Sequence, residues 1–273
     1  MLDVRPSPIA GTWYEGHAKT LARSIDEYLN HAKLPELDGE VLAVIAPHAG
    51  HRYSGAVAGY AFAAVRSRSF DVVAVISPFH NLARYPLITT AHDAYATPLG
   101  NIAVDKAALT ELQTHLDIPI TPVFADKEHS LEIELPFLQR ALIGNFKLLP
   151  IMIRAQEMDV AQKLGHALAK VLKDKNALLV ASTDLSHFYD QTTANALDSE
   201  MLKRFEAFDP ESIFEAEQTG KAFACGHAAV AAVLWAAREL GANKAQVLQH
   251  ATSGDVTGDY SSVVGYGAAA ILR

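Results

Sequence analysis

The stretch Val41-Leu-Ala-Val-Ile-Ala46, followed directly by Pro47-His48-Ala49-Gly50, decides the fold class. It is a short, wholly apolar run rich in β-branched residues, which is typical of a strand buried on both faces of a sheet. Three further runs have the same character, at 72–76 (VVAVI), 148–153 (LLPIMI) and 177–181 (ALLVA). The sequence therefore predicts a parallel or mixed sheet whose two faces are both covered by other elements.

Segments with helical patterns lie between these runs and are expected to cover the two faces of the sheet. Leu21, Ile25 and Leu29 recur at helical spacing within 17–33, which indicates an amphipathic helix after an irregular arm at 1–16. Further elements are predicted as helices at 55–67, 128–143, 156–173, 191–206 and 226–240, and as a closing strand at 262–272. No Pro/Gly/Ser-rich linker and no repeat divides the chain. We therefore expect one α/β domain over residues 1–273, with a central mixed or parallel sheet covered by helices.

The composition limits the classes of partner. Of the 273 residues, 50% are hydrophobic, and the net charge is −8. A large core can therefore form, and the negative charge disfavours a nucleic-acid backbone as partner. The single cysteine, Cys225, excludes an intrachain disulfide. No apolar run reaches the roughly 18–20 residues of a membrane helix, and the N-terminus lacks a signal-peptide pattern. We expect a cytoplasmic protein that binds neither nucleic acid nor membrane.

Three of the predicted strands are followed by a histidine. His48 follows the strand at 41–46, His80 follows the strand at 72–76, and His187 follows the strand at 177–181 in Thr183-Asp184-Leu185-Ser186-His187. Ligands in open α/β folds bind outside the carboxyl ends of the strands, and parallel strands bring those ends to one edge. Neutral imidazole is the commonest metal ligand in proteins. A single loop histidine is usually a surface residue, but three in matched positions predict a shared site.

The segment after His48 is predicted to turn from strand into helix. Ser54 is the expected N-cap of the helix at 55–67. The small residues Gly55, Ala58 and Gly59 would let that helix pack closely against the sheet. A tight turn explains the glycines, but it leaves the His51-Arg52-Tyr53 cluster unexplained, and these side chains are expected at the rim of a pocket.

Cys225 precedes an apolar run, AAVAAVLWAA, that is typical of a buried helix. A cysteine at a helix N-terminus has its thiolate stabilised by the helix dipole. A thiolate is both a nucleophile and a soft metal ligand. The alternative is an inert core cysteine, which is frequent among lone cysteines.

Glu128 and His129 open the helix predicted at 128–143. Glu128 and Glu132 are four residues apart and would share one face of that helix. Acidic residues in a first turn usually serve the helix dipole. His129 is therefore either a structural residue or part of the pocket, and the sequence leaves both interpretations open.

Taken together, these motifs resemble the Memo family, whose microbial members are also labelled AmmeMemoRadiSam system protein B. The resemblance implies a single α/β domain similar in fold to the class III non-haem iron extradiol dioxygenases, with a pocket at the sheet edge. The matching stretches lie in order over almost the whole chain: Arg5-Pro6-Ser7, Ala10–Tyr14, Ala46–Gly50, Tyr53–Gly55, Ser77–His80, Glu128–Phe137, Ser182–His187 and Cys225-Gly226.

The resemblance also implies roles for individual residues. The metal positions of the family fall on His48, His80 and Cys225, and His187 matches an acid/base histidine of the dioxygenases, with Asp184 beside it. The dioxygenases use two histidines and a carboxylate, whereas the third position here is a cysteine. A thiolate is softer and easily oxidised, which favours iron, copper or zinc and disfavours ring cleavage. Iron is the metal expected first, with copper or zinc as alternatives.

Three functions are consistent with these residues. The first is a metal-dependent, dioxygenase-like redox enzyme in which His187 is the general acid/base and Asp184 or Glu128 orients it, with His129 as a further candidate catalytic residue. The second is a non-enzymatic protein whose pocket sequesters a metal or recognises a peptide or small molecule. The third is a hydrolase with Cys225 as nucleophile beside His187 or His227. The microbial label further implies a functional association with a radical-SAM protein and an AMMECR-type protein.

Overall fold

The computed structural model describes residues 2–124 and 126–273. Its strands are β1 (Val4–Arg5), β2 (Val41–Ala46), β3 (Val72–Pro78), β4 (Leu87–Thr90), β5 (Ala94–Thr97), β6 (Gly100–Ala103), β7 (Ile120–Val123), β8 (Lys147–Ile153), β9 (Ala177–Ser182), β10 (His187–Tyr189), β11 (Lys244–Thr252) and β12 (Val263–Leu272). Its helices are α1 (Ala18–His31), α2 (His51–Ala63), α3 (Lys106–Thr114), the 3₁₀ turn η1 (Glu132–Glu134), α4 (Leu135–Ala141), α5 (Met158–Leu172), α6 (Gln191–Glu206), α7 (Pro210–Gln218), α8 (His227–Glu239) and α9 (Gly254–Thr257).

The main sheet is mixed, as predicted. Over the described residues its strand order is β10-β12-β2-β9-β3-β8-β4-β7, with β11 also paired to β12. The central strands β2, β9, β3 and β8 run parallel, while β12 and β4 pair antiparallel on either side of them. Strands β1, β5 and β6 form a separate small sheet. The carboxyl ends of β2, β9 and β3 consequently lie together at one edge.

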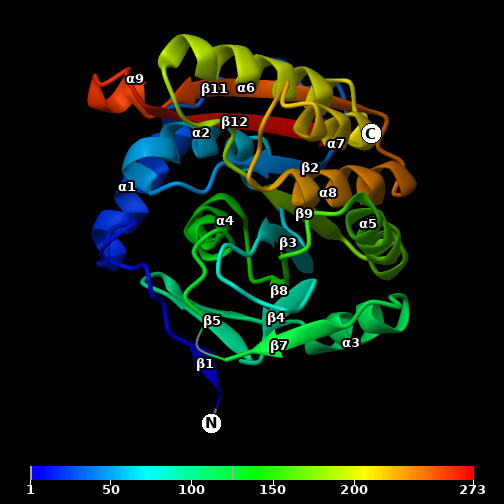
Figure 1. Ribbon diagram of the computed structural model, residues 1–273. Coiled ribbons are helices and arrows are strands. Elements are labelled where there is room, and N and C mark those ends of the chain that lie inside the picture. The colour runs from blue at the N-terminus through cyan, green and yellow to red at the C-terminus, as the bar shows by residue number, and fades with distance from the viewer. Residues whose placement is uncertain (1, 125) are drawn as a thin grey trace.

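Helices cover both faces of the main sheet, which explains why its central strands are apolar throughout. Side chains of β2 alternate between two hydrophobic cores: Ala43 and Ile45 enter one, and Val44 and Ala46 enter the other. The first core includes residues of α5, α6, α7 and α8, and the second includes residues of α1, α2 and α4. Figure 1 shows α1 with α2 and α5 with α8 on opposite sides of the central strands. None of the helices in the described residues has the length and apolar character needed to cross a bilayer.

Helix α2 begins four residues before the predicted start, and Ser54 does not cap it. The backbone N–H groups of Tyr53 and Ser54 already bond to the carbonyl of Gly50, which is the N-cap. The Ser54 hydroxyl instead donates back to the carbonyl of Ala49, 2.9 Å away. Gly55 and Gly59 face α1 rather than the sheet, because a Cβ at Gly59 would lie 2.8 Å from the carbonyl oxygen of Tyr28.

The helix predicted at 128–143 begins only at Glu132, as η1 followed by α4. The carboxylate of Glu128 accepts hydrogen bonds from the backbone N–H groups of His129 and Ser130, at 2.9 and 3.0 Å. A side chain that bonds its own backbone competes with helix formation. The prediction that Glu128 and Glu132 share a helical face was therefore wrong.

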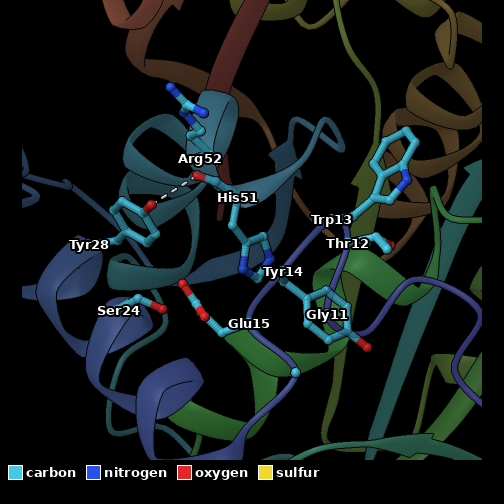
Figure 2. A pocket seen from close by; sticks show the side chains of 10 residues that line it. Gly11, Thr12, Trp13, Tyr14, Glu15, Ser24, Tyr28, His51 and Arg52 are labelled. Atoms are coloured by element: carbon cyan, nitrogen blue, oxygen red, sulfur yellow. Dashed lines mark hydrogen bonds between the residues drawn. The ribbon is translucent and has the colours of Figure 1, made fainter.

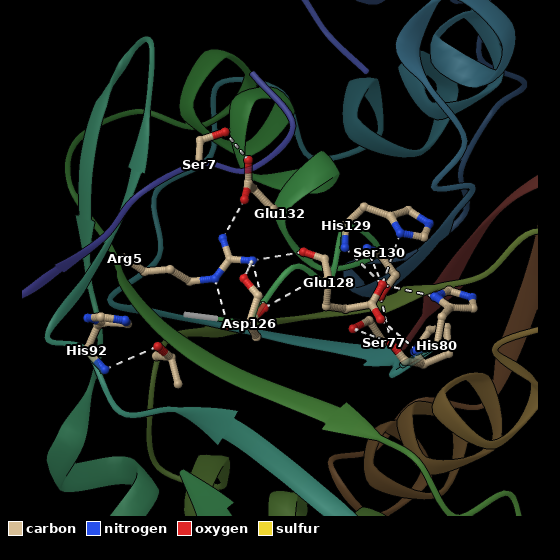
Figure 3. Close-up of polar contacts among 12 residues, drawn as sticks. Arg5, Ser7, Ser77, His80, His92, Asp126, Glu128, His129, Ser130 and Glu132 are labelled. Atoms are coloured by element: carbon tan, nitrogen blue, oxygen red, sulfur yellow. Dashed lines mark hydrogen bonds and ion pairs between the residues drawn. The ribbon is translucent and has the colours of Figure 1, made fainter. Parts of the chain in front are cut away.

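The N-terminal arm is anchored to this segment by Arg5, which is only 1% exposed. Its guanidinium pairs with Asp126 at 2.7 Å and with Glu132, and it donates to the carbonyl of Glu128 at 2.9 Å. Figure 3 shows Arg5 between these groups, with Ser7 bonded to the far oxygen of Glu132. The arm thus fixes the path of the chain immediately around Glu128.

Replacing Arg5 by Met tests the importance of this anchor. The change leaves two buried carboxylates without their cation, so we expect the free energy of unfolding to fall by about 3–5 kcal/mol. Arg140→Met is the control, because Arg140 pairs with Asp26 where both side chains are more than a third exposed, and we expect it to cost below about 1 kcal/mol. Urea denaturation of both variants measures the difference, and equal losses would contradict the anchoring role.

Candidate metal centre

Three histidine side chains meet at the carboxyl edge of the central strands. His48 follows β2 and His80 follows β3, as predicted, and His129 joins them from the segment that Arg5 anchors. One ring nitrogen from each lies within 4.8 Å of those from the other two. The rings of His80 and His129 are stacked with centroids 4.8 Å apart, and His48 meets both edge-on. Such a group can hold a metal ion.

Glu128 orients two of these rings. Its carboxylate lies 2.9 Å from Nδ1 of His80, accepts the His80 backbone N–H at 2.6 Å, and lies 3.2 Å from Nδ1 of His129 (Figure 3). Burial acts to raise the pKa of Glu128, but the bonds from His80 and from the N–H of Ser130 outweigh it and hold that pKa well below its usual range. The ionised carboxylate thus leaves Nε2 of both rings facing away from it, which is the support that metal-binding histidines commonly receive.

His48 is held by a different set of partners. Its Nδ1 lies 2.9 Å from the hydroxyl of Ser182, and its backbone N–H donates to Asp184 at 2.7 Å. Burial lowers the pKa of His48 well below its usual value, so the ring is neutral. Burial also raises the pKa of Asp184 to about 7, against the opposing effect of the N–H groups of His48 and Ala49.

Cys225 lies beside His48 but outside the three-histidine group. Its Sγ is 3.2 Å from Nε2 of His48 and accepts the backbone N–H of Asp184 at 3.3 Å. Helix α8 begins at His227, with Gly226 as its N-cap. The prediction of a dipole-stabilised thiolate was wrong for the metal-free protein, because burial, and next the charge of Asp184, raise the pKa of the Cys225 thiol.

His187 is the first residue of β10, close to the same edge. Its ring contacts those of Phe188 and Phe223, with centroids 5.6 and 5.5 Å away. Burial lowers its pKa, and its Nδ1 is buried without a hydrogen-bond partner among the described residues. The carboxylates of Asp184 and Glu128 accept the backbone N–H groups of His48 and His80, respectively. Among the described residues, neither carboxylate hydrogen-bonds His187. The ring of His187 therefore contacts two aromatic rings and has no carboxylate partner among the described residues.

His51 was expected at the pocket rim, but it is only 6% exposed. Its ring packs between Tyr14 and Phe137, with Nε2 3.0 Å from the carbonyl of Ile133. Figure 2 shows the ring pointing from α2 toward Tyr14 and Glu15, where it borders a separate cavity of about 390 Å³. Of the three predicted rim residues, Arg52 and Tyr53 are exposed.

A mixed sheet covered by helices, with a histidine cluster at the edge of its parallel strands, defines an α/β protein with a group of side chains that could hold a metal ion. A family model described as Memo-like protein matches residues 5–270, and the chain belongs to this family. It is 34% identical over 270 residues to a MEMO1 family protein of Nitrosopumilus maritimus, covering 97% of this chain and 98% of the relative. It is 34% identical over 275 residues to one of Methanothermobacter thermautotrophicus (96% and 98% covered) and 31% identical over 282 residues to one of Pyrobaculum aerophilum (100% of both).

Glu128→Gln tests the support of the histidines. An amide carries no charge and can no longer accept from both rings and the backbone, so we expect the Kd for Zn²⁺ to rise about 10–100-fold. Competition with a chromogenic chelator measures this constant. Glu27→Gln, at a carboxylate that is 61% exposed, is the matched control and should bind as the wild type does. The same Kd in both variants would show that Glu128 does not support the ligands.

His51 should make the fold sensitive to acid. Burial lowers its pKa to about 4, against the opposing effect of the bond to Ile133. Between pH 6.5 and 4 the unfolded chain binds a proton at His51 that the folded protein does not, so stability falls as the pH falls through this window. His51→Gln should flatten this slope, by on the order of 3 kcal/mol across the window. Urea denaturation at several pH values measures it, and the exposed His31→Gln should keep the wild-type slope.

Proposed function

We propose that this Memo-family chain is a metal-binding protein whose ion is held by His48, His80 and a third ligand, Cys225 or His129. The observation that carries the proposal is the convergence of three imidazoles within 4.8 Å, each with an oxygen beside its Nδ1. This arrangement leaves the Nε2 atoms of the three rings to coordinate the metal. We propose iron as the metal, with copper or zinc as the alternatives that a thiolate or imidazole set also suits.

Two side chains compete for the third position. Cys225 is the residue that the resemblance implies, and its Sγ already contacts Nε2 of His48 at 3.2 Å. His129 has the position that the geometry of the three rings favours, and burial lowers its pKa to about 4, so its ring is neutral and able to bind a metal. Cys225 suits a softer ion, and its thiol must lose a proton to bind it. An all-histidine set suits zinc, copper or iron without that step.

The proposed activity is that of a metal-dependent, dioxygenase-like redox enzyme. A bound redox metal would supply Lewis-acid or electron-transfer chemistry at this pocket. His187 would move the proton: burial lowers its pKa, so it is neutral near pH 7 and starts as a base. The rings of Phe188 and Phe223 contact the ring of His187. A fold like that of the extradiol dioxygenases is part of this proposal and rests on the resemblance.

The second candidate is a protein that uses the same pocket to hold a metal, small molecule or peptide without turnover. The missing carboxylate partner of His187 in the described residues favours it, because acid/base histidines are usually oriented by a third group. Association with radical-SAM and AMMECR-type proteins is compatible with either candidate, and it rests on the resemblance alone. A hydrolase using Cys225 is disfavoured, because desolvation raises the pKa of its part-buried thiol.

Elemental analysis of anaerobically purified protein tests the proposal. We expect about one iron, copper or zinc per chain in the wild type, and its loss in His48→Ala and His80→Ala. Cys225→Ser and His129→Ala identify the third ligand by which of them also loses the metal. His166→Ala is the control, because His166 is a partly exposed residue paired with Glu239. Wild-type protein that contains no metal and takes none up would overturn the proposal.

Oxygen consumption by metal-loaded wild type then separates the two candidates. Turnover with catechols or other small aromatics, lost in His187→Ala while the metal is retained, would support the enzyme. A bound metal with no turnover would support the binding protein.

A further inference from the structure

The hydroxyl of Ser182 links the ring of His48 to the buried carboxyl group of Glu134. Ser182 ends β9 and is 0% exposed. Its Oγ lies 2.9 Å from Nδ1 of His48, 2.7 Å from the carbonyl oxygen of Ser130 and 2.8 Å from Oε1 of Glu134. All three distances are those of hydrogen bonds.

The hydrogens of this cluster can be assigned by counting donors. A serine hydroxyl has one hydrogen to donate and two lone pairs to accept with. The carbonyl of Ser130 can only accept, so the hydroxyl hydrogen of Ser182 belongs there. The other two contacts are hydrogen bonds only if His48 donates from Nδ1 and Glu134 donates from a protonated carboxyl group. If Glu134 were ionised, the single hydroxyl hydrogen of Ser182 could bond only one of its two oxygen neighbours. The other one, the carbonyl oxygen of Ser130 or Oε1 of Glu134, would then lie against Oγ of Ser182 with no hydrogen between the two oxygens.

The surroundings of Glu134 agree with this count. The side chain of Glu134 is 0% exposed, and its neighbours in the sequence, Ile133 and Leu135, belong to the hydrophobic core. Its other oxygen, Oε2, has no hydrogen-bond partner among the described residues. An ionised carboxylate with an unsatisfied oxygen in such a place costs much more than a neutral acid. Burial, and to a smaller extent the charge of Asp184, accordingly raise the pKa of Glu134 well above its ordinary value.

We propose that Glu134 is a buried carboxylic acid that acts through Ser182 as a positioning residue for His48, holding its ring as the Nδ1–H tautomer. Nε2 of His48 then presents its lone pair to the pocket before any ligand arrives. Only the expected effect on metal binding rests on the proposed function, because the tautomer of His48 affects binding if Nε2 coordinates a metal. The tautomer itself is a property of the metal-free protein. Glu134 and Glu128 therefore support the site in opposite ways, one as a neutral donor and one as an anionic acceptor.

Two substitutions at Glu134 separate a donor from an anion. Glu134→Gln keeps a hydrogen-bond donor for Ser182, and Glu134→Met removes it while keeping an unbranched side chain. In metal-free protein, ¹⁵N NMR of the His48 ring should show the Nδ1–H tautomer in wild type and Gln variant, and a mixture of tautomers in the Met variant and in Ser182→Ala. The Kd for Zn²⁺ should stay within about 2-fold in the Gln variant and rise about 10–100-fold in the other two.

Infrared difference spectra between wild type and Glu134→Gln give a direct measurement of the acid. At pH 7 the wild type should show the carbonyl band of a protonated carboxylic acid that the Gln variant lacks. A carboxylate band in its place, or a Gln variant that weakens Zn²⁺ binding as much as the Met variant, would overturn the proposal. An unchanged His48 tautomer in Ser182→Ala would also overturn it. If wild type binds no Zn²⁺ the proposed function fails, while the tautomer and the carboxyl band still decide this inference.

Discussion

The site depends on one buried anion, the carboxylate of Glu128. It is 1% exposed, yet it remains ionised because the backbone N–H groups of His80, His129 and Ser130 all donate to it. Those bonds offset the desolvation that burial imposes on the charge. The same oxygens face Nδ1 of His80 and of His129. One side chain therefore turns the local backbone away from a helix and aligns two of the three imidazoles at once.

The position of that carboxylate depends in turn on the N-terminal arm. Arg5 reaches from β1 into the protein and neutralises Asp126 and Glu132, which flank Glu128 in the chain. The side chain of Arg5 is 1% exposed, so its guanidinium contacts these buried groups rather than solvent. His48 and His80 follow strands β2 and β3 of the sheet, and His129 lies on the segment that Arg5 of the arm anchors. The histidine cluster therefore depends on two parts of the fold, the central sheet and the segment anchored by Arg5.

This division explains what could be predicted from the sequence. Elements whose pattern is local were predicted closely: α6 has the expected bounds, and β2 and β9 match their apolar runs to within a residue. His48 and His80 were expected at one edge because parallel strands bring their ends together. The short strands β4 to β7 and β10 carry no such run. The grouping of His129 with His48 and His80 was not predicted, because the pattern of residues 128–131 is typical of a helix. The carboxylate of Glu128 instead bonds the neighbouring backbone N–H groups, and this conformation is held by contacts with Arg5 and His80, which are far away in the sequence.

The charge of the metal-free pocket bears on the choice of third ligand. His48 and His129 are neutral, the thiol of Cys225 keeps its proton, and Glu128 supplies the negative charge. If His129 completes the set, the ligands themselves carry no charge and Glu128 balances the cation from behind two rings. If Cys225 completes it, the lost thiol proton adds an anion in direct contact with the ion. That second anion stabilises the more oxidised state of a redox metal, so the identity of the third ligand would set both the metal and its chemistry.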